Sequence, residues 1–303
     1  MTTLQQKLAS GRFVITAEIT PPVSFERADL IAKAAPLKGL ADAVNVTDGA
    51  GARPHMGALA AAAILAHEGV EPILQLTCRD RNRIALQSEL MGAAASGVDN
   101  LLILRGDDPS AGDQPDTKGV FDLDARGLIE TARRLRDTNE LPSGRKVAGT
   151  ARFLIGAADS PIDPPAGWEP KGLAAKVSAG AQFAQTQFCM DAGVVARYMA
   201  RLAEHGIADK LKVIIGIAPL RSAKSARWMK EKLFGTIIPD AMVDRLDKAA
   251  DPVAEGIAIA VDLIAELAGV AGVAGVHIMA PNNDAAVPQV IGAARARVQR
   301  LSA

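Results

Sequence analysis

The chain has few aromatic residues and only two cysteines, Cys78 and Cys189. Aromatic side chains make up 3% of the 303 residues. Two cysteines cannot build the dense disulfide framework of a small secreted protein, so we expect reduced thiols in a cytoplasmic protein. Net charge is also absent, because 34 basic residues balance 34 acidic ones. A neutral chain has no electrostatic reason to bind nucleic acid or an anionic membrane.

Long apolar runs and metal-binding spacings are missing too. Residues 1–12 lack the apolar stretch of a signal peptide, and the alanine-rich run 59–66 is too short to cross a bilayer. The four histidines show no H-E-x-x-H spacing, so we expect no metal site. With 49% hydrophobic and 22% charged residues, the composition is that of a soluble globular protein.

Strand-like and helix-like segments alternate along the whole chain. Each short run of aliphatic and β-branched residues is followed by a stretch that is typical of a helix. The expected strands are residues 13–19, 42–47, 72–77, 100–104, 146–154, 183–188, 211–217 and 275–279. The proline-rich segment 156–170 is expected to be a loop.

Eight consecutive βα units predict an α/β fold with a parallel sheet, closed as a (β/α)8 TIM barrel. Such a barrel needs ~250 residues, and no change in composition divides the chain. We therefore expect one catalytic barrel domain over residues 1–303. An open Rossmann sheet is less favoured, because no G-x-G-x-x-G follows a strand and opens a helix. The sequence leaves the oligomeric state open.

Polar residues gather where the expected strands end, and TIM barrels build their sites from these ends. Glu18 follows the alternation of Val14 and Thr16, so it should point into the barrel. Asp107 follows the fourth expected strand. Gln187 lies at the end of the sixth. Each has a structural alternative: Asp107 could pair with Arg105 or cap a turn, and Gln187 could be a satisfied core amide. Two carboxylates and an amide at one end of a barrel nevertheless favour a polar small-molecule site.

Six motifs in order resemble the methylenetetrahydrofolate reductase family. They are TAEITPP (16–22), VNVTDGA (44–50), QLTCRD (75–80), LRGDDP (104–109), KVSAGA (176–181) and TQFCMD (186–191). The resemblance implies reduction of 5,10-methylenetetrahydrofolate to 5-methyltetrahydrofolate. It implies that Glu18 is the general acid that helps to protonate N10, and that Asp107 stabilises the resulting cation. Gln187 would contact folate and nicotinamide in turn.

The same resemblance implies FAD as cofactor and NADH or NADPH as hydride donor in a ping-pong reaction. The flavin-binding positions it implies are Thr47, Asp48, Gln75, Arg105, Gly106, Asp107, Phe153 and Lys176. Arg105 and Lys176 would suit the pyrophosphate as fixed cations. Arg221, after the seventh strand, is a candidate contact for the folate tail.

Three positions and one segment depart from the family pattern. Gln75 stands where a histidine is common, Asp48 where a tyrosine is common, and Ala223 where a phenylalanine usually stacks on the substrate. Residues 153–158 replace a Tyr-Pro-Glu-x-His-Pro segment. These departures keep two alternatives open: direct hydride transfer from NAD(P)H without flavin, and a non-redox folate-binding or methyl-transfer partner subunit. A lyase with Lys176 as a Schiff-base lysine is less favoured, because Lys176 is expected on a helix.

Overall fold

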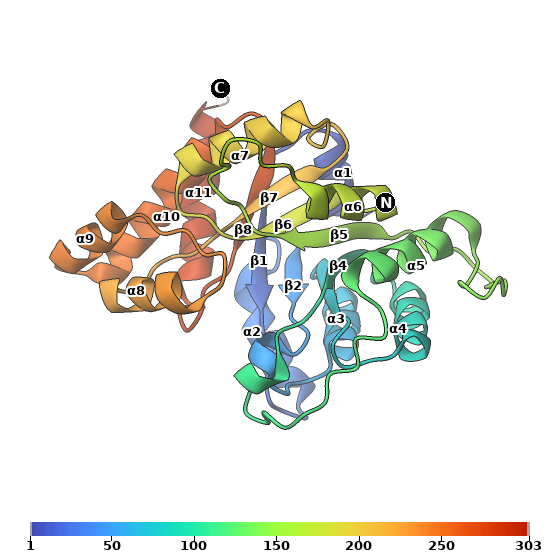
Figure 1. The fold of residues 1–303 in the computed structure, drawn as a ribbon. Coiled ribbons are helices and arrows are strands. Elements are labelled where there is room, and N and C mark those ends of the chain that lie inside the picture. The colour runs from blue at the N-terminus through green and yellow to red at the C-terminus, as the bar shows by residue number, and fades with distance from the viewer. Residues whose placement is uncertain (1, 302–303) are drawn as a thin grey trace.

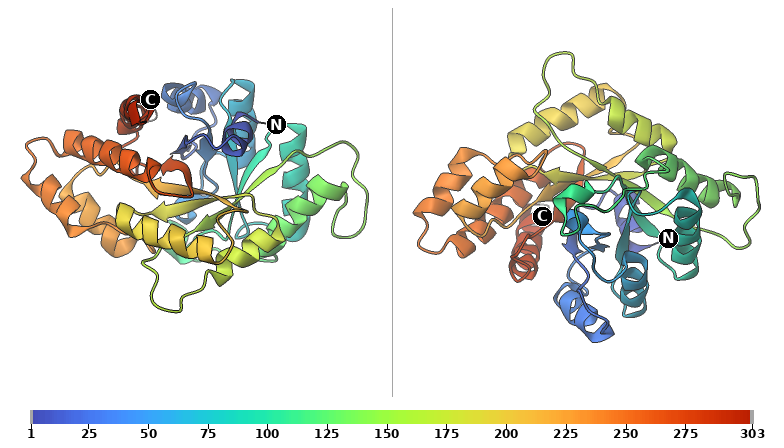
Figure 2. Two further views of the ribbon diagram at one scale, coloured as in Figure 1. Left: turned by 90° about the horizontal axis from the view of Figure 1, so that it is seen from above. Right: turned by 60° about the horizontal axis from the view of Figure 1, so that its bottom comes forward.

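The alternating segments form a closed barrel of eight parallel strands in the computed structural model, which describes residues 2–301. Each strand pairs with the next, and β8 pairs with β1 to close the ring. The helices surround the strands on the outside (Figures 1 and 2). The predicted TIM barrel is thereby confirmed.

The eight strands lie close to the expected runs, with one exception. They are β1 Val14–Ile19, β2 Val44–Val46, β3 Pro72–Thr77, β4 Asn100–Leu104, β5 Leu154–Asp159, β6 Phe183–Phe188, β7 Lys212–Ile217 and β8 Val273–Ile278.

Eleven α-helices connect or flank these strands within the described part of the chain. They are α1 Thr3–Ala9, α2 Arg27–Ala34, α3 Ala58–His67, α4 Arg83–Ala95, α5 Ala125–Thr138, α6 Lys171–Ala179, α7 Ala192–Glu204, α8 Ala223–Lys232, α9 Asp240–Lys248, α10 Pro252–Ala268 and α11 Ala286–Leu301. None of the helices within residues 2–301 has both the length and the apolar character that a membrane crossing needs.

The first helix, α1, was not among the sequence-based expectations. Its apolar residues Leu4 and Leu8 are buried against the barrel interior, where they join Ile73 and Phe183. Because Thr2 caps this helix and Glu71 accepts hydrogen bonds from its first backbone amides, the short polar segment folds onto the barrel. The amino-terminal end of the barrel is therefore closed by α1.

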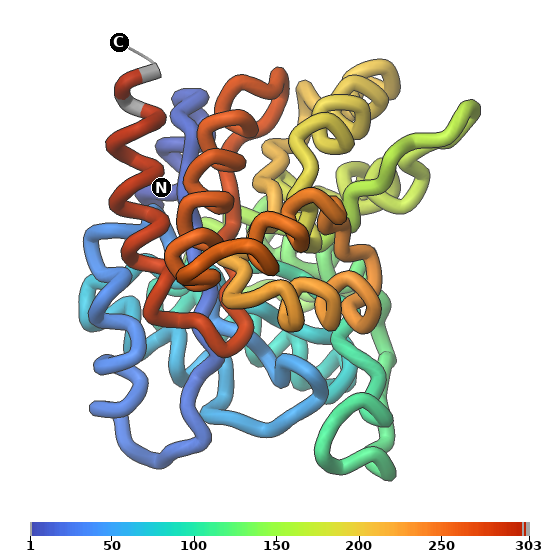
Figure 3. Tube along the Cα trace, turned by 90° about the vertical axis from the view of Figure 1, so that its left-hand side faces the viewer, coloured from blue at the N-terminus to red at the C-terminus, as the bar shows by residue number. Residues whose placement is uncertain are grey.

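Asp42 ties the two ends of the chain to the barrel. Its carboxylate accepts hydrogen bonds from Lys7 on α1 and from the backbone amide of Ile15, and it pairs with Arg295 on α11 at 2.8 Å. Burial alone would raise the pKa of Asp42, but these donors hold it below its ordinary value. Figure 3 shows the red C-terminal helix lying beside the blue N-terminal segments that this ion pair joins.

The prediction for the fifth strand, residues 146–154, is wrong. The structure places β5 at Leu154–Asp159, inside the segment that was expected to be a loop. The loop was expected from the prolines and glycines of residues 156–170, but the prolines begin only at Pro161, after the strand, and Gly156 lies within it. Here the missing side chain makes room for the ring of Phe183, whose Cζ would lie 2.2 Å from a Cβ on Gly156.

Substituting Gly156 tests this packing. Gly156→Ala should destabilise the protein by roughly 1–3 kcal/mol, because the new methyl group overlaps the Phe183 ring. Gly292→Ala, in α11, meets no atom within 4 Å and should instead stabilise by about 0.5–1 kcal/mol. Urea unfolding of both variants checks the pair. Equal stability of Gly156→Ala and the wild type would show that the ring moves aside.

Candidate active site

The interior of the barrel changes from apolar to polar along its axis. Near α1 it is filled by Val14, Ile73 and Phe183, which belong to one buried cluster. Two and four residues further along β1, the inward positions hold Thr16 and Glu18. The polar end is the carboxyl end of the strands, where TIM barrels bind their ligands.

Glu18 lies just inside this mouth, with 23% of its side chain exposed. Gln75 Nε2 donates a hydrogen bond of 2.8 Å to Glu18 Oε2, and His277 Nε2 lies 3.7 Å from the same oxygen. Both neighbours hold Oε2 from within the barrel. The other carboxyl oxygen, Oε1, is therefore the one best placed to meet a ligand.

A buried polar network supports Glu18 from below, and the sequence analysis did not find it. Gln185 exchanges two hydrogen bonds with Asn45, of 2.7 and 3.1 Å. It also donates to the Thr16 hydroxyl over 3.1 Å, and this hydroxyl lies 3.0 Å from His277 Nδ1. The Thr16 hydroxyl also lies 3.4 Å from the Val276 carbonyl, to which it donates, so Asn45, Gln185, Thr16 and His277 form one connected network beneath Glu18.

These residues carried one usable signal in the sequence. Asn45, Gln185 and His277 are polar residues at inward positions inside strands, where a barrel core is usually apolar. They lie inside the strands and not at their ends, so they were not among the candidates predicted from the sequence. His277 lies beside the candidate acid, although its spacing to the other histidines carries no motif.

Asp107 is brought to the same mouth from the loop after β4. Its Oδ2 accepts a 2.8 Å hydrogen bond from the backbone amide of Gly51, in the loop after β2. The Asp48 carboxylate is engaged in bonds within the protein. It accepts hydrogen bonds from the backbone amide and the hydroxyl of Thr77, and it pairs with Arg81. The neighbouring Thr47 hydroxyl is buried and has no hydrogen-bond partner among the described residues.

Arg105 and Lys176 lie on one cavity of about 870 Å³ between the ends of β4 and β5. The Arg105 guanidinium stacks over the Phe121 ring, 4.9 Å from its centre. Lys176 Nζ donates to the Ala158 carbonyl over 2.6 Å. Gly106 adopts a φ of +93°, and a side chain there would strike Arg79 and Thr77, so only glycine fits this turn. Arg126 lines the cavity as a third cation, and Asp124 and Asp159 line it as carboxylates, so the cationic side chains outnumber the acidic ones and suit an anionic group.

Asp159, at the end of β5, also lines this cavity and was missed because the strand was misplaced. Tyr198 on α7 donates a hydrogen bond to its carboxylate, and Trp168 packs against the Tyr198 ring at 5.9 Å. Burial raises the pKa of Asp159, and burial together with the nearby carboxylate raises that of Tyr198. Trp168 thus anchors the loop after β5.

Gln187 and Arg221 lie at the carboxyl ends of β6 and β7. Gln187 Nε2 donates to the Phe234 carbonyl over 3.2 Å, and its Oε1 accepts from the Phe188 amide over 3.0 Å. Each amide atom keeps one further hydrogen-bonding position. Arg221 is exposed in the loop before α8.

Phe153 is not brought together with the other predicted cofactor residues. It precedes β5, at the amino end of the strand, and is buried between the barrel and its helices, near Leu90 on α4 and Leu135 on α5. Because residues 154–158 form most of the strand, the loop after the fifth strand begins at Ser160 instead.

The remaining reactive groups have structural surroundings. Burial raises the pKa of Cys78 and of Cys189 to about 11, so neither thiol ionises readily. His55 accepts a hydrogen bond from the Gly49 amide. Within residues 2–301, histidine, cysteine and carboxylate side chains form no cluster that could hold a metal ion.

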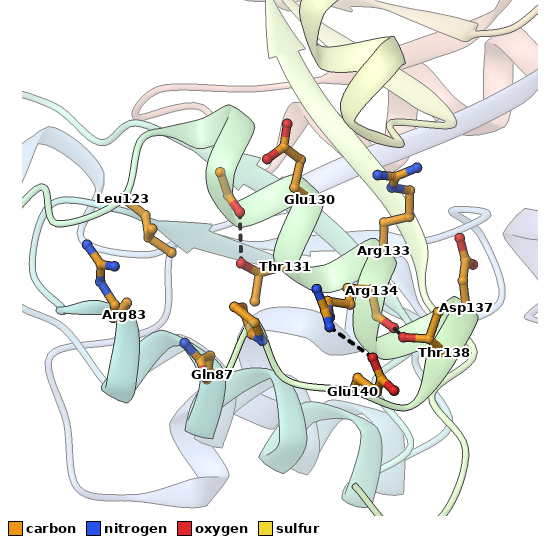
Figure 4. Close-up of a pocket in the computed structure, with 12 residues that line it drawn as sticks. Arg83, Gln87, Leu123, Glu130, Thr131, Arg133, Arg134, Asp137, Thr138 and Glu140 are labelled. Atoms are coloured by element: carbon orange, nitrogen blue, oxygen red, sulfur yellow. Dashed lines mark hydrogen bonds and ion pairs between the residues drawn. The ribbon is translucent and has the colours of Figure 1, made fainter. Parts of the chain in front are cut away.

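A second cavity, of about 680 Å³, lies on the outside of the barrel between α4 and α5 (Figure 4). Its walls carry charged side chains that contact one another, such as Arg134 and Glu140 at 2.9 Å. None of the strand-end residues described above lines it. The mouth of the barrel therefore remains the candidate active site.

Sequence comparisons point to one family. The family model described as methylenetetrahydrofolate reductase matches residues 3–295. A probable methylenetetrahydrofolate reductase (NADPH) of Caenorhabditis elegans is 30% identical over 191 residues, which are 62% of this chain and 26% of that protein. Methylenetetrahydrofolate reductase 2 of Schizosaccharomyces pombe is 27% identical over 197 residues, 63% of this chain and 29% of its own length. The aligned part thus spans less than a third of either relative.

A structure comparison agrees on the fold. A protein from Clostridium thermocellum, which binds two copies of 5-methyl-5,6,7,8-tetrahydrofolic acid, superposes with a TM-score of 0.65 at 16% identity. The match covers 99% of this chain and 100% of that protein. Because this family model covers nearly the whole chain, which folds as a closed barrel, the chain belongs to the methylenetetrahydrofolate reductase family.

Proposed function

We propose that this chain reduces 5,10-methylenetetrahydrofolate to 5-methyltetrahydrofolate with NADH or NADPH as hydride donor. The observation that carries the proposal is the placement of Glu18 at the barrel mouth, supported by Gln75 and by a buried network that includes His277. The folate-binding neighbour in the structure comparison adds support.

Glu18 acts as the general acid. Because Gln75 donates to Oε2, Oε1 is the oxygen that would pass a proton to N10 of the folate. Protonation of N10 breaks its bond to the bridging carbon and leaves an iminium cation at N5. The Asp107 carboxylate, held by the Gly51 amide, stabilises this cation. A hydride then adds to the methylene carbon and gives the methyl group.

The cavity between β4 and β5 fits part of a flavin dinucleotide. Arg105 and Lys176 would hold the pyrophosphate. Gly106 lets the loop after β4 pack closely on Arg79 and Thr77. When bound, FAD supplies a carrier that accepts a hydride from NAD(P)H and passes it on.

Direct hydride transfer from NAD(P)H to the folate, without flavin, is the second candidate mechanism. It is favoured because two of the predicted flavin-binding side chains are already engaged within the protein. Asp48 is paired with Arg81, and Gln75 donates a hydrogen bond to Glu18. Phe153 lies at the other end of its strand. A non-redox folate-binding subunit is less favoured, because a protein that only binds folate does not need a general acid such as Glu18, held in place by Gln75.

Removing the acid tests the proposed reaction. Glu18→Gln should lower kcat for folate-dependent NAD(P)H oxidation by roughly 10²- to 10⁴-fold, the usual contribution of a general acid. Binding of 5-methyltetrahydrofolate should persist, because the glutamine amide has the same size and shape as the carboxyl group and can still form hydrogen bonds. The matched control is Glu26→Gln, an exposed glutamate in the loop after β1, which should leave kcat unchanged. A wild-type protein that binds folate but never oxidises NAD(P)H would leave only the binding function.

The visible absorption spectrum separates the two hydride routes. With FAD, the purified protein should show flavin bands that NAD(P)H bleaches, and its initial-rate plots should be parallel, as in ping-pong kinetics. A Lys176→Met or Arg105→Met variant should then lose the flavin bands on dialysis before the wild type does. A colourless protein that stays colourless after soaking with FAD, with intersecting initial-rate plots, would establish direct transfer instead.

A further inference from the structure

One arginine in the loop after β3 connects three of the loops that form the mouth. Arg79 is 4% exposed, although it is a charged residue next to the surface. Its Nη1 and Nη2 both donate to the Gly49 carbonyl over 3.2 Å, and Nη1 also lies 3.4 Å from the Asp107 carbonyl. The Arg79 carbonyl accepts a 2.6 Å hydrogen bond from the Val120 amide, at the far end of the loop after β4.

The guanidinium is itself held in place. Asp80 binds it through two hydrogen bonds of 2.7 Å, from Nε and Nη2. The hydrogen bonds that Arg79 donates to the Asp80 carboxylate raise the pKa of Arg79 above its ordinary value, with burial opposing them. A buried charge that is paired and bonded in this way keeps one orientation, because leaving any of its donors unpaired is costly.

The surrounding glycines show how closely the loops pack on Arg79. A Cβ on Gly49 would lie 2.2 Å from Arg79 Nη2, and a Cβ on Gly106 would lie 2.8 Å from Arg79 Cβ. Both glycines have positive φ angles, which residues with a side chain rarely adopt, so both turns require glycine. Gly49 leads to Gly51, whose amide binds Asp107, and Gly106 directly precedes Asp107.

We propose that Arg79 is the positioning residue for Asp107: it fixes the loop after β2 and the loop after β4 on each other, and so sets where the Asp107 carboxylate meets the substrate. This inference rests on the proposed function, in which Asp107 stabilises the iminium cation. Arg79 holds the Asp107 backbone directly, and it holds the carboxylate through Gly49 and the Gly51 amide.

The neighbouring arginines have different tasks, which makes them useful for comparison. Arg81 pairs with Asp48, and Arg83 pairs with Asp122 through two hydrogen bonds of 2.8 and 2.9 Å. Arg83 is the more exposed, with 58% of its side chain accessible. It contacts neither Gly49 nor Asp107, so Arg83→Met is the matched control.

The experiment compares kcat with folate binding in four variants: Arg79→Met, Arg83→Met, Asp107→Asn and the double variant Arg79→Met/Asp107→Asn. Arg79→Met should lower kcat for methylenetetrahydrofolate reduction by roughly 10- to 100-fold, because a carboxylate displaced by about 1 Å loses its transition-state contact. The Kd for 5-methyltetrahydrofolate, which carries no iminium charge, should change little. Arg83→Met should match the wild type.

The double variant decides whether Arg79 acts through Asp107. If it does, adding Arg79→Met to Asp107→Asn should lower kcat no further, since the carboxylate to be positioned is already gone. A kcat for the double variant that falls by the product of the two single effects would overturn the proposal, as would an unchanged kcat in folded Arg79→Met. A wild type with no folate reduction would instead refute the proposed function itself.

Two milder changes keep the test valid if Arg79→Met does not fold. Arg79→Lys retains the charge but loses the two-pronged geometry, and Asp80→Asn leaves Arg79 in place but weakens its anchor. Both should lower kcat in the same direction, with melting temperatures near that of the wild type. A lower melting temperature with unchanged kcat in both variants would assign Arg79 a purely structural role and overturn the proposal.

Discussion

The pairing of β8 with β1 is the contact on which the candidate site depends. It joins Val14–Ala17 to Gly275–Ile278 and thereby closes the ring. The same pairing brings His277 beside Thr16, a residue 261 positions earlier in the chain. Because all eight strands are parallel, their carboxyl ends then surround a single mouth, and loops that are far apart in sequence can share one ligand.

The polar interior beneath Glu18 follows from that closure. Thr16, Asn45 and Gln185 come from three different strands and are fully buried, yet they satisfy one another through hydrogen bonds. Such a network is costly unless each member has its partner, so it fixes the side chains above it in a defined arrangement. Apolar packing at the other end, including α1 and the Phe183 ring against Gly156, supplies the stability on which this polar end relies.

The mouth divides into two halves of different character. In the loops after β2, β3 and β4, Arg81 pairs with Asp48 and the Gly51 amide holds Asp107, with Arg79 between Gly49 and the Asp107 backbone. The ends of β4 and β5 carry Arg105 and Lys176 around an open cavity. A cation formed on the substrate suits the first half, and an anionic part of a dinucleotide suits the second. Arg105 and Asp107, two residues apart, connect the two halves along the chain.

The amino-acid sequence by itself determined the eight βα units, and the rule that barrels use their strand ends was enough to select Glu18, Asp107 and Gln187. It could not assign β5, because Gly156 is a loop signal in isolation and becomes a strand residue only where Phe183 fills its space. Nor could it find the network around His277 or the role of Arg79, since the partners of these residues lie on other strands and loops. Periodicity reports which face of a strand is buried, but a hydrogen bond between distant strands exists only once the barrel has closed.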